Sequence, residues 1–150
     1  MPMKILLASD GSPGALHAAQ WVDRYADPTQ TQVIIMTVVQ ASLGIGQVAY
    51  AVDPGVHDQL MDAVITEAEE AAQHTRESMP RLHPPWLTQI SPNIVQAILD
   101  AADEQGADVI VVGRRGYGTW SSAFLGSVSL QLITHSPRPV WVIPPSPKIP

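Results

Sequence analysis

Glycines, hydroxyl side chains and two arginines gather between positions 113 and 129 of this chain. Gly113, Gly116 and Gly126 would let backbone N–H groups approach a ligand. Ser127 and Ser129 open a predicted helix, whose first N–H groups and dipole favour an anion, and their hydroxyls add two donors. Arg114 and Arg115 could meet phosphate charge. The segment therefore predicts a phosphate site, although turn glycines and solvated surface arginines are the alternative interpretation.

Two common nucleotide motifs do not fit the sequence. A P-loop of the GxxxxGK[ST] kind is excluded here because no lysine lies between Lys4 and Lys148. No GxGxxG fingerprint follows the first apolar run, which weakens a dinucleotide-dehydrogenase interpretation.

Other chemistry-bearing residues form weaker patterns. The pairs Asp53/His57 and Glu70/His74 have helical i, i+4 spacing, but such pairs are more often solvated than metal-binding. No GxSxG nucleophile elbow is present, so hydrolase chemistry of that type lacks a basis.

The elements that position these residues follow from apolar periodicity. Strands are predicted at 3–8, 33–39, 86–90, 109–112 and 139–143, and helices at 13–25, 57–79, 93–105 and 127–135. Ser12 and Pro13 fit the N-cap and the first helical position. Residues 40–56 are expected to form a long mobile loop, 113–126 a glycine-rich loop and 144–150 a frayed tail.

Fully apolar strands that alternate with amphipathic helices indicate a parallel sheet covered on both faces. We expect one domain over residues 1–150: an α/β, Rossmann-like, open doubly wound sheet of five parallel strands. In such sheets ligands bind at the carboxyl ends of the strands, where the strand order reverses. The loops to inspect therefore follow the first strand, at Ala8-Ser9-Asp10-Gly11, and the fourth strand, at Gly113.

Composition excludes several function classes. The chain has 150 residues, no cysteine and a formal net charge of −6. Disulfides, thiol nucleophiles and Cys-ligated metals are thereby excluded, and nonspecific nucleic-acid binding is disfavoured. No stretch has the apolar length of a membrane span or a signal-peptide core, so no membrane association and a cytoplasmic location are expected.

The spacing Gly113-x-x-Gly116, nine residues, then Gly126-Ser127 resembles the G-2x-G-9x-G-[ST] nucleotide motif of the universal stress protein family. Residues 3–12 are similar to that family's first strand and acidic turn, 106–113 to its fourth strand and 136–143 to its last strand. One departure is Ser91-Pro92-Asn93, where the family often has a glycine and an acidic residue.

The resemblance implies the ATP-binding branch of the family, with ATP and Mg²⁺, or AMP or ADP, as ligand. Ala8, Ser9 and Asp10 would border the adenine and ribose, and Asp10 could hold a cation through water. The remaining implied nucleotide-binding residues are Val38 at the base, then Val112, Gly113, Arg115, Gly116, Gly126, Ser127, Val128 and Ser129. The alternatives are a turn residue for Asp10 and plain core for Val38.

Three functions remain open at this point. The leading hypothesis is an ATP-binding regulatory module in stress response. The others are a slow ATP hydrolase or adenine-nucleotide enzyme of the same architecture, and a nucleotide-independent dimeric scaffold. The apolar last strand, with no helix after it, and the resemblance together predict a two-fold homodimer through 139–143, with Trp141 buried near the partner.

Overall fold

The computed structural model describes residues 1–40, 51, 53–114 and 125–145. Its strands are β1 (Met3–Ala8), β2 (Thr31–Gln40), β3 (Trp86–Ser91), β4 (Val109–Gly113) and β5 (Val140–Ile143). Its helices are α1 (Pro13–Tyr25), α3 (Pro54–Glu77), α4 (Ile94–Glu104) and α5 (Ser127–His135). No helix among these residues is long and apolar enough to cross a membrane.

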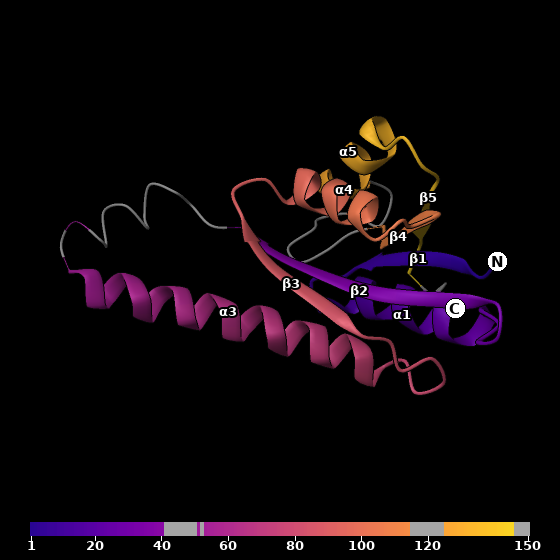
Figure 1. Ribbon diagram of the computed structural model, residues 1–150, viewed down its shortest axis with the longest axis horizontal. Coiled ribbons are helices and arrows are strands. Elements are labelled where there is room, and N and C mark those ends of the chain that lie inside the picture. The colour runs from indigo at the N-terminus through magenta and orange to yellow at the C-terminus, as the bar shows by residue number, and fades with distance from the viewer. Residues whose placement is uncertain (41–50, 52, 115–124, 146–150) are drawn as a thin grey trace, which may run out of the picture.

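The strands form one parallel sheet in the order β3-β2-β1-β4-β5. Strand β1 is central: Ile5 is in register with Val33 of β2 on one side and Val109 of β4 on the other. Helices α1 and α3 cover one face, and α4 and α5 cover the other (Figure 1). The predicted five-stranded, doubly wound α/β fold is confirmed.

Alternation along the central strands divides the core into two layers. Leu7, Ile35 and Val111 point to the α1 and α3 side, whereas Leu6, Met36 and Ile110 point to the α4 and α5 side, and all six are nearly inaccessible to solvent. This burial on both faces explains why the strands are continuous apolar runs.

Capping residues determine where the helices begin. The Ser12 hydroxyl accepts a hydrogen bond from Ala15 N at 3.3 Å, and Pro13 occupies the first helical position, as predicted. The same device operates at α3, where Asp53 Oδ1 accepts from Gly55 N at 2.9 Å and Pro54 comes first.

Several predicted boundaries were therefore wrong by a few residues. Helix α3 begins at Pro54 rather than at 57, because Asp53 caps it. The predicted loop 40–56 also loses Gln40, which pairs with Ser91 at the end of β3. Gly113 belongs to β4, and β2 begins at Thr31, opposite Met3. Residues 41–50, 52, 115–124 and 146–150 of the predicted loops and tail lie outside the described residues.

The Glu69 carboxylate connects α3 to the edge strand β3. Its Oε1 accepts from the Thr88 hydroxyl at 2.6 Å, and its Oε2 accepts from Trp86 Nε1 at 2.7 Å. These two donors, Thr88 first, hold the pKa of Glu69 below its ordinary value because they favour the charged form. The guanidinium of Arg76 lies over the Trp86 ring, 5.3 Å from its centroid, and adds a cation–π contact at the same place.

Replacing Glu69 should lower the stability of the fold, and the effect should depend on pH. A carboxyl whose pKa is lowered in the folded state stabilises above its unfolded pKa, and the contribution is lost as the pH falls through the folded pKa. We expect Glu69→Gln to lower the free energy of unfolding at pH 7 by roughly 1 kcal/mol, because solvent screens these hydrogen bonds. The gap from the parent chain should close in acid, below the ordinary glutamate pKa.

Urea unfolding between pH 3 and pH 7 measures this difference. Glu70→Gln, at an exposed neighbour on the same helix, is the matched control and should leave stability unchanged. Equal losses for the two variants would show that the connection to β3 contributes nothing.

Candidate functional site

A cavity of about 290 Å³ opens at the carboxyl ends of the strands, where the order reverses between β1 and β4. Arg114, which was predicted to meet phosphate charge, is not among the residues that line this cavity, but ten other predicted residues are. These are Ala8, Ser9, Asp10, Val38, Val112, Gly113, Gly126, Ser127, Val128 and Ser129. Arg115 and Gly116 lie outside the described residues. The structure thus brings the two predicted loops together, and nucleotide binding by these residues stays a prediction.

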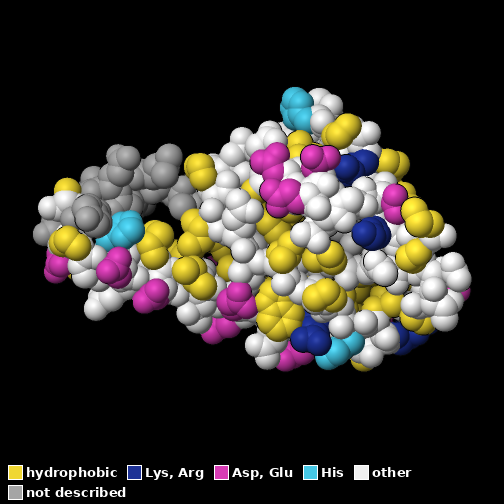
Figure 2. Space-filling view, viewed as in Figure 1, with side chains coloured by type: hydrophobic (Ala, Val, Ile, Leu, Met, Phe, Trp, Pro, Cys, Tyr) yellow, Lys and Arg dark blue, Asp and Glu magenta, His cyan; other side chains and the backbone are white. Residues whose placement is uncertain are grey.

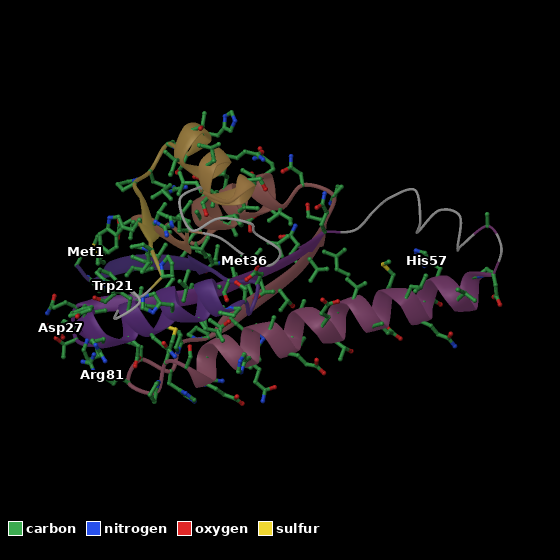
Figure 3. All side chains as sticks on the ribbon, turned by 180° about the vertical axis from the view of Figure 1, so that it is seen from behind. Met1, Trp21, Asp27, Met36, His57 and Arg81 are labelled. Atoms are coloured by element: carbon green, nitrogen blue, oxygen red, sulfur yellow. The ribbon has the colours of Figure 1, made fainter. Side chains whose placement is uncertain are left out.

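Four apolar wall residues were missed by the sequence analysis. Met36 lies two residues before Val38 on β2, and Ile94 and Ile98 are one turn apart on α4. Ala15, in the first turn of α1, completes the set. Strand alternation could have identified Met36, because it shares a face of β2 with Val38, whereas no residue of α4 was in the predicted wall and so Ile94 and Ile98 had no such signal. Figure 3 labels Met36 between the two layers of helices.

The Ser9 hydroxyl is committed to the protein framework. Thr75 of α3 donates its proton to Ala71 O at 2.8 Å, so in the 2.7 Å contact between the hydroxyls Ser9 is the donor. Ser9 Oγ also accepts from Gly11 N at 3.2 Å. The Ser9 hydroxyl therefore has no proton to donate to a ligand while its bond to Thr75 is in place, and its backbone N–H already donates to Met36 O at 2.9 Å.

Asp10 occupies the turn between β1 and α1 with an exposed side chain. Its Oδ1 accepts from Ser12 N at 2.9 Å, which is the turn-residue role considered from the sequence. Next to it, Gly11 has a φ of +76°, and a Cβ there would lie 3.1 Å from Ala71 Cβ of α3. This turn needs glycine for both its backbone conformation and its close approach to α3.

Gly113 is required by the protein's own packing. A Cβ at this position would lie 2.7 Å from the carbonyl oxygen of Gly14 in α1, a contact that real side chains do not make. The expectation that its missing side chain makes room for a ligand was therefore wrong: helix α1 occupies that space. Gly113 still contributes backbone to the cavity wall.

Three helices begin at the cavity, and they differ in capping. The first turns of α1 and α4 are capped by Ser12 and by Asn93, whose Oδ1 accepts from Gln96 N at 3.0 Å. Helix α5 begins after Gly126, which supplies no side-chain cap. Its opening N–H groups thus lack the partner that a capping oxygen would provide, and its dipole favours negative charge there.

The Ser129 hydroxyl connects α5 to β4. It is buried and donates to Gly113 O at 2.8 Å, so the predicted donation from Ser129 to a phosphate is unavailable while this bond is in place. Gly126 N donates to Arg114 O at 2.8 Å and fixes the start of the helix beside the end of the strand. Ser127 is the exposed hydroxyl left at this end of the cavity wall.

Metal ligands are sparse in the described part of the chain. Within it no group of three or more His, Asp or Glu side chains could hold a metal ion. Asp53, one of the predicted i, i+4 partners, serves as the cap of α3. A cation held by Asp10 through water stays a prediction.

Comparison with known proteins adds the family. Residues 1–144 match the sequence profile of the universal stress protein family. A universal stress protein of Synechocystis is 32% identical over 146 residues, covering 93% of this chain and 84% of its own. One from Thermus aquaticus is 32% identical over 148 residues, covering 93% of this chain and 96% of its own.

Solved structures share the architecture. The universal stress protein UspA of Lactobacillus plantarum has a TM-score of 0.71 at 25% identity and covers 94% of this chain and 97% of its own. A universal stress protein in complex with cAMP has a TM-score of 0.58 at 22% identity, covering 97% of this chain and 98% of its own. One from Archaeoglobus fulgidus in complex with dAMP has a TM-score of 0.59 at 18% identity, covering 95% of this chain and 97% of its own.

The contact between Gly113 and α1 leads to a stability prediction. Gly113→Ala should lower the free energy of unfolding by roughly 2 kcal/mol, since the obstacle is backbone that cannot rotate away. Thermal or urea unfolding measures the loss. Gly106→Asn is the control: Gly106 has a φ of +63°, which asparagine tolerates, and open space around it. A Gly113→Ala variant as stable as the control would mean that α1 does not pack this closely.

Proposed function

The chain belongs to the universal stress protein family, and on that premise we propose that its cavity binds an adenine nucleotide, ATP with Mg²⁺ foremost. The bound nucleotide serves as a regulatory ligand in the cell's response to stress, in the cytoplasm. AMP and ADP fit the same arrangement, because they share the base, the ribose and the first phosphate of ATP.

The uncapped start of α5, opposite an apolar wall, is the observation that carries this proposal. Met36, Val38, Ile94 and Ile98 give one side of the cavity a surface suited to a flat base. At the other side, the N–H groups that follow Gly126 suit phosphate oxygens. A ligand with an apolar ring at one end and an anion at the other matches this division.

The exposed Asp10 carboxylate supplies the remaining polar group. It is placed to accept hydrogen bonds from ribose hydroxyls or to hold the waters of a Mg²⁺ ion that neutralises phosphate charge. Two family structures support the class of ligand, since one holds cAMP and the other dAMP, both adenine nucleotides.

The wall chemistry favours binding over turnover. Asp10 is the one ionisable side chain among the described lining residues. General acid–base catalysis needs positioned groups that donate and accept protons, and a single exposed carboxylate offers no such pair. We therefore expect any ATP hydrolysis by this protein to be slow, and we do not propose hydrolysis as its function.

A valine at position 126 should abolish nucleotide binding without unfolding the protein. Gly126 has a φ of −67° and a ψ of 158°, which valine adopts readily, and its added side chain would stand at the phosphate end. Ser127→Ala should weaken binding by about 1 kcal/mol for one lost hydrogen bond. Calorimetry with ATP, with and without Mg²⁺, and with AMP and adenosine measures both effects.

Leu130→Ser, an exposed position further along α5, is the matched control and should bind like the parent chain. Unchanged ATP affinity in a folded Gly126→Val variant would refute the phosphate position. Absence of binding by the parent chain to every adenine nucleotide would favour the nucleotide-independent scaffold.

We also propose a two-fold homodimer through the edge strand β5. This strand pairs with β4 on one side, and its other edge is unpaired within the described residues. Trp141 is 38% exposed, and its ring meets Trp21 of α1 edge-on at 6.5 Å between centroids, with Tyr25 against Trp21. An apolar, aromatic surface beside an open strand edge suits association.

Light scattering at micromolar concentration tests the dimer. Val142→Lys should convert it to a monomer, because the charge would have to be desolvated beside the pairing edge. Circular dichroism establishes that the variant is folded. The edge strand β3 provides the matched change, Leu87→Lys, which should leave the dimer intact. A parent chain of monomer mass, 16.1 kDa, would rule out this interface.

A further inference from the structure

The first half of helix α3 extends beyond the sheet. None of the described side chains from Pro54 to Glu67 is buried, and the buried positions of the helix begin at Ala68. At about 1.5 Å per residue, this stretch is roughly 20 Å long. Figure 1 shows it projecting past the end of β3. We name residues 54–67 the acidic arm.

An apolar stripe runs along the arm. Leu60, Met61, Val64 and Ile65 fall at helical spacing and continue the row that is buried at Ala68. Leu60 is 40% exposed and Ile65 is 46% exposed, values unusual for large apolar side chains on the same row as a core. Figure 2 shows hydrophobic side chains along the upper side of the arm, and Figure 3 labels His57 near its far end.

Acidic side chains border the stripe on both margins. Asp58 and Asp62, one turn apart, lie beside Ile65, while Glu67 shares the margin of Leu60, two turns away. The sequence contains no lysine or arginine between Arg24 and Arg76. The arm therefore presents an apolar row between two acidic edges, with His57 at the far end of the row, 3.6 Å from the Asp58 carboxylate.

We infer that the acidic arm is a docking surface for a basic amphipathic helix of another protein. A partner helix with an apolar face bordered by lysine or arginine would cover the stripe and place a positive charge opposite each negative margin. A second copy of this chain is disfavoured, because pairing two arms brings carboxylates together. This surface is separate from the cavity and does not depend on the proposed nucleotide.

A designed peptide tests the inference. The probe is a fluorescein-labelled leucine–lysine helix of about 18 residues, long enough to span the arm, with leucines along one face. Two comparison peptides serve as controls. The first has the probe's composition, reordered so that leucines lie on all sides of the helix. The second keeps the probe's pattern but has glutamate in place of lysine. Fluorescence anisotropy with the full chain, at low and at moderate salt, gives each affinity.

The arm variants separate the two components of binding. Leu60→Ser/Val64→Ser/Ile65→Ser should weaken the probe about 10-fold or more, because apolar anchors dominate such interfaces. Asp58→Asn/Asp62→Asn/Glu67→Gln should weaken it several-fold and flatten its salt dependence. Matched controls are Leu130→Ser/Ile133→Ser on α5 and Asp100→Asn/Asp103→Asn/Glu104→Gln on α4, which should bind like the parent chain.

Four results would overturn the inference. Equal binding of the reordered peptide, or equal losses in the α4 and α5 controls, would show nonspecific attraction to an acidic protein. A change in particle mass in the Leu60→Ser/Val64→Ser/Ile65→Ser variant would show that the stripe binds a second copy of this chain. A large drop in melting temperature in the stripe variant, with no probe binding to the parent chain, would mean that the chain covers its own stripe.

Discussion

The contact between the end of β4 and the first turn of α1 constrains the whole site. Because a Cβ at Gly113 would lie 2.7 Å from Gly14 O, strand and helix can approach only as backbone against backbone. This approach brings Ala15 to the cavity wall, and the carbonyl of the same Gly113 accepts from Ser129, which anchors α5. One residue without a side chain thus sets the spacing of two helices around the point where the strand order reverses.

Around that point, some serine hydroxyls form hydrogen bonds within the protein, and others are left for a ligand. Ser9 and Ser129 lie in the cavity wall, yet each commits its proton to the protein, to Thr75 and to Gly113 O. The polar character left for a ligand comes from the backbone at the start of α5, Ser127 and the Asp10 carboxylate. Through Ser9 and Gly11 the first loop also rests on α3, so the cavity rim and the helix that carries the acidic arm share one support.

The sequence predicted the fold well because its strands are unbroken apolar runs and its helices carry recognisable caps. Ser12-Pro13 was identified as a helix start, but the equivalent Asp53-Pro54 was not, since nearby glycines favoured a loop. Most of the predicted cavity residues lie in or beside two loops that glycines and polar residues mark, whereas Val38 was implied by the family resemblance alone. The apolar wall at Met36, Ile94 and Ile98 was missed because a residue that lines a cavity and one that fills a core follow the same periodicity. The direction of a missing side chain, as at Gly113, depends on tertiary contact and cannot be derived from spacing.

The central position of β1 has a consequence for synthesis of the chain. Its partner β2 follows within a few dozen residues, but β4, in register from Ile5 with Val109, is made about a hundred residues later. Until then the nascent chain carries Leu6 and Leu7 on a strand with one open edge, and such edges are prone to wrong pairing. The open edge of β1 is therefore covered only after β4 has left the ribosome, and the sheet is complete only when β5, its last strand, has followed.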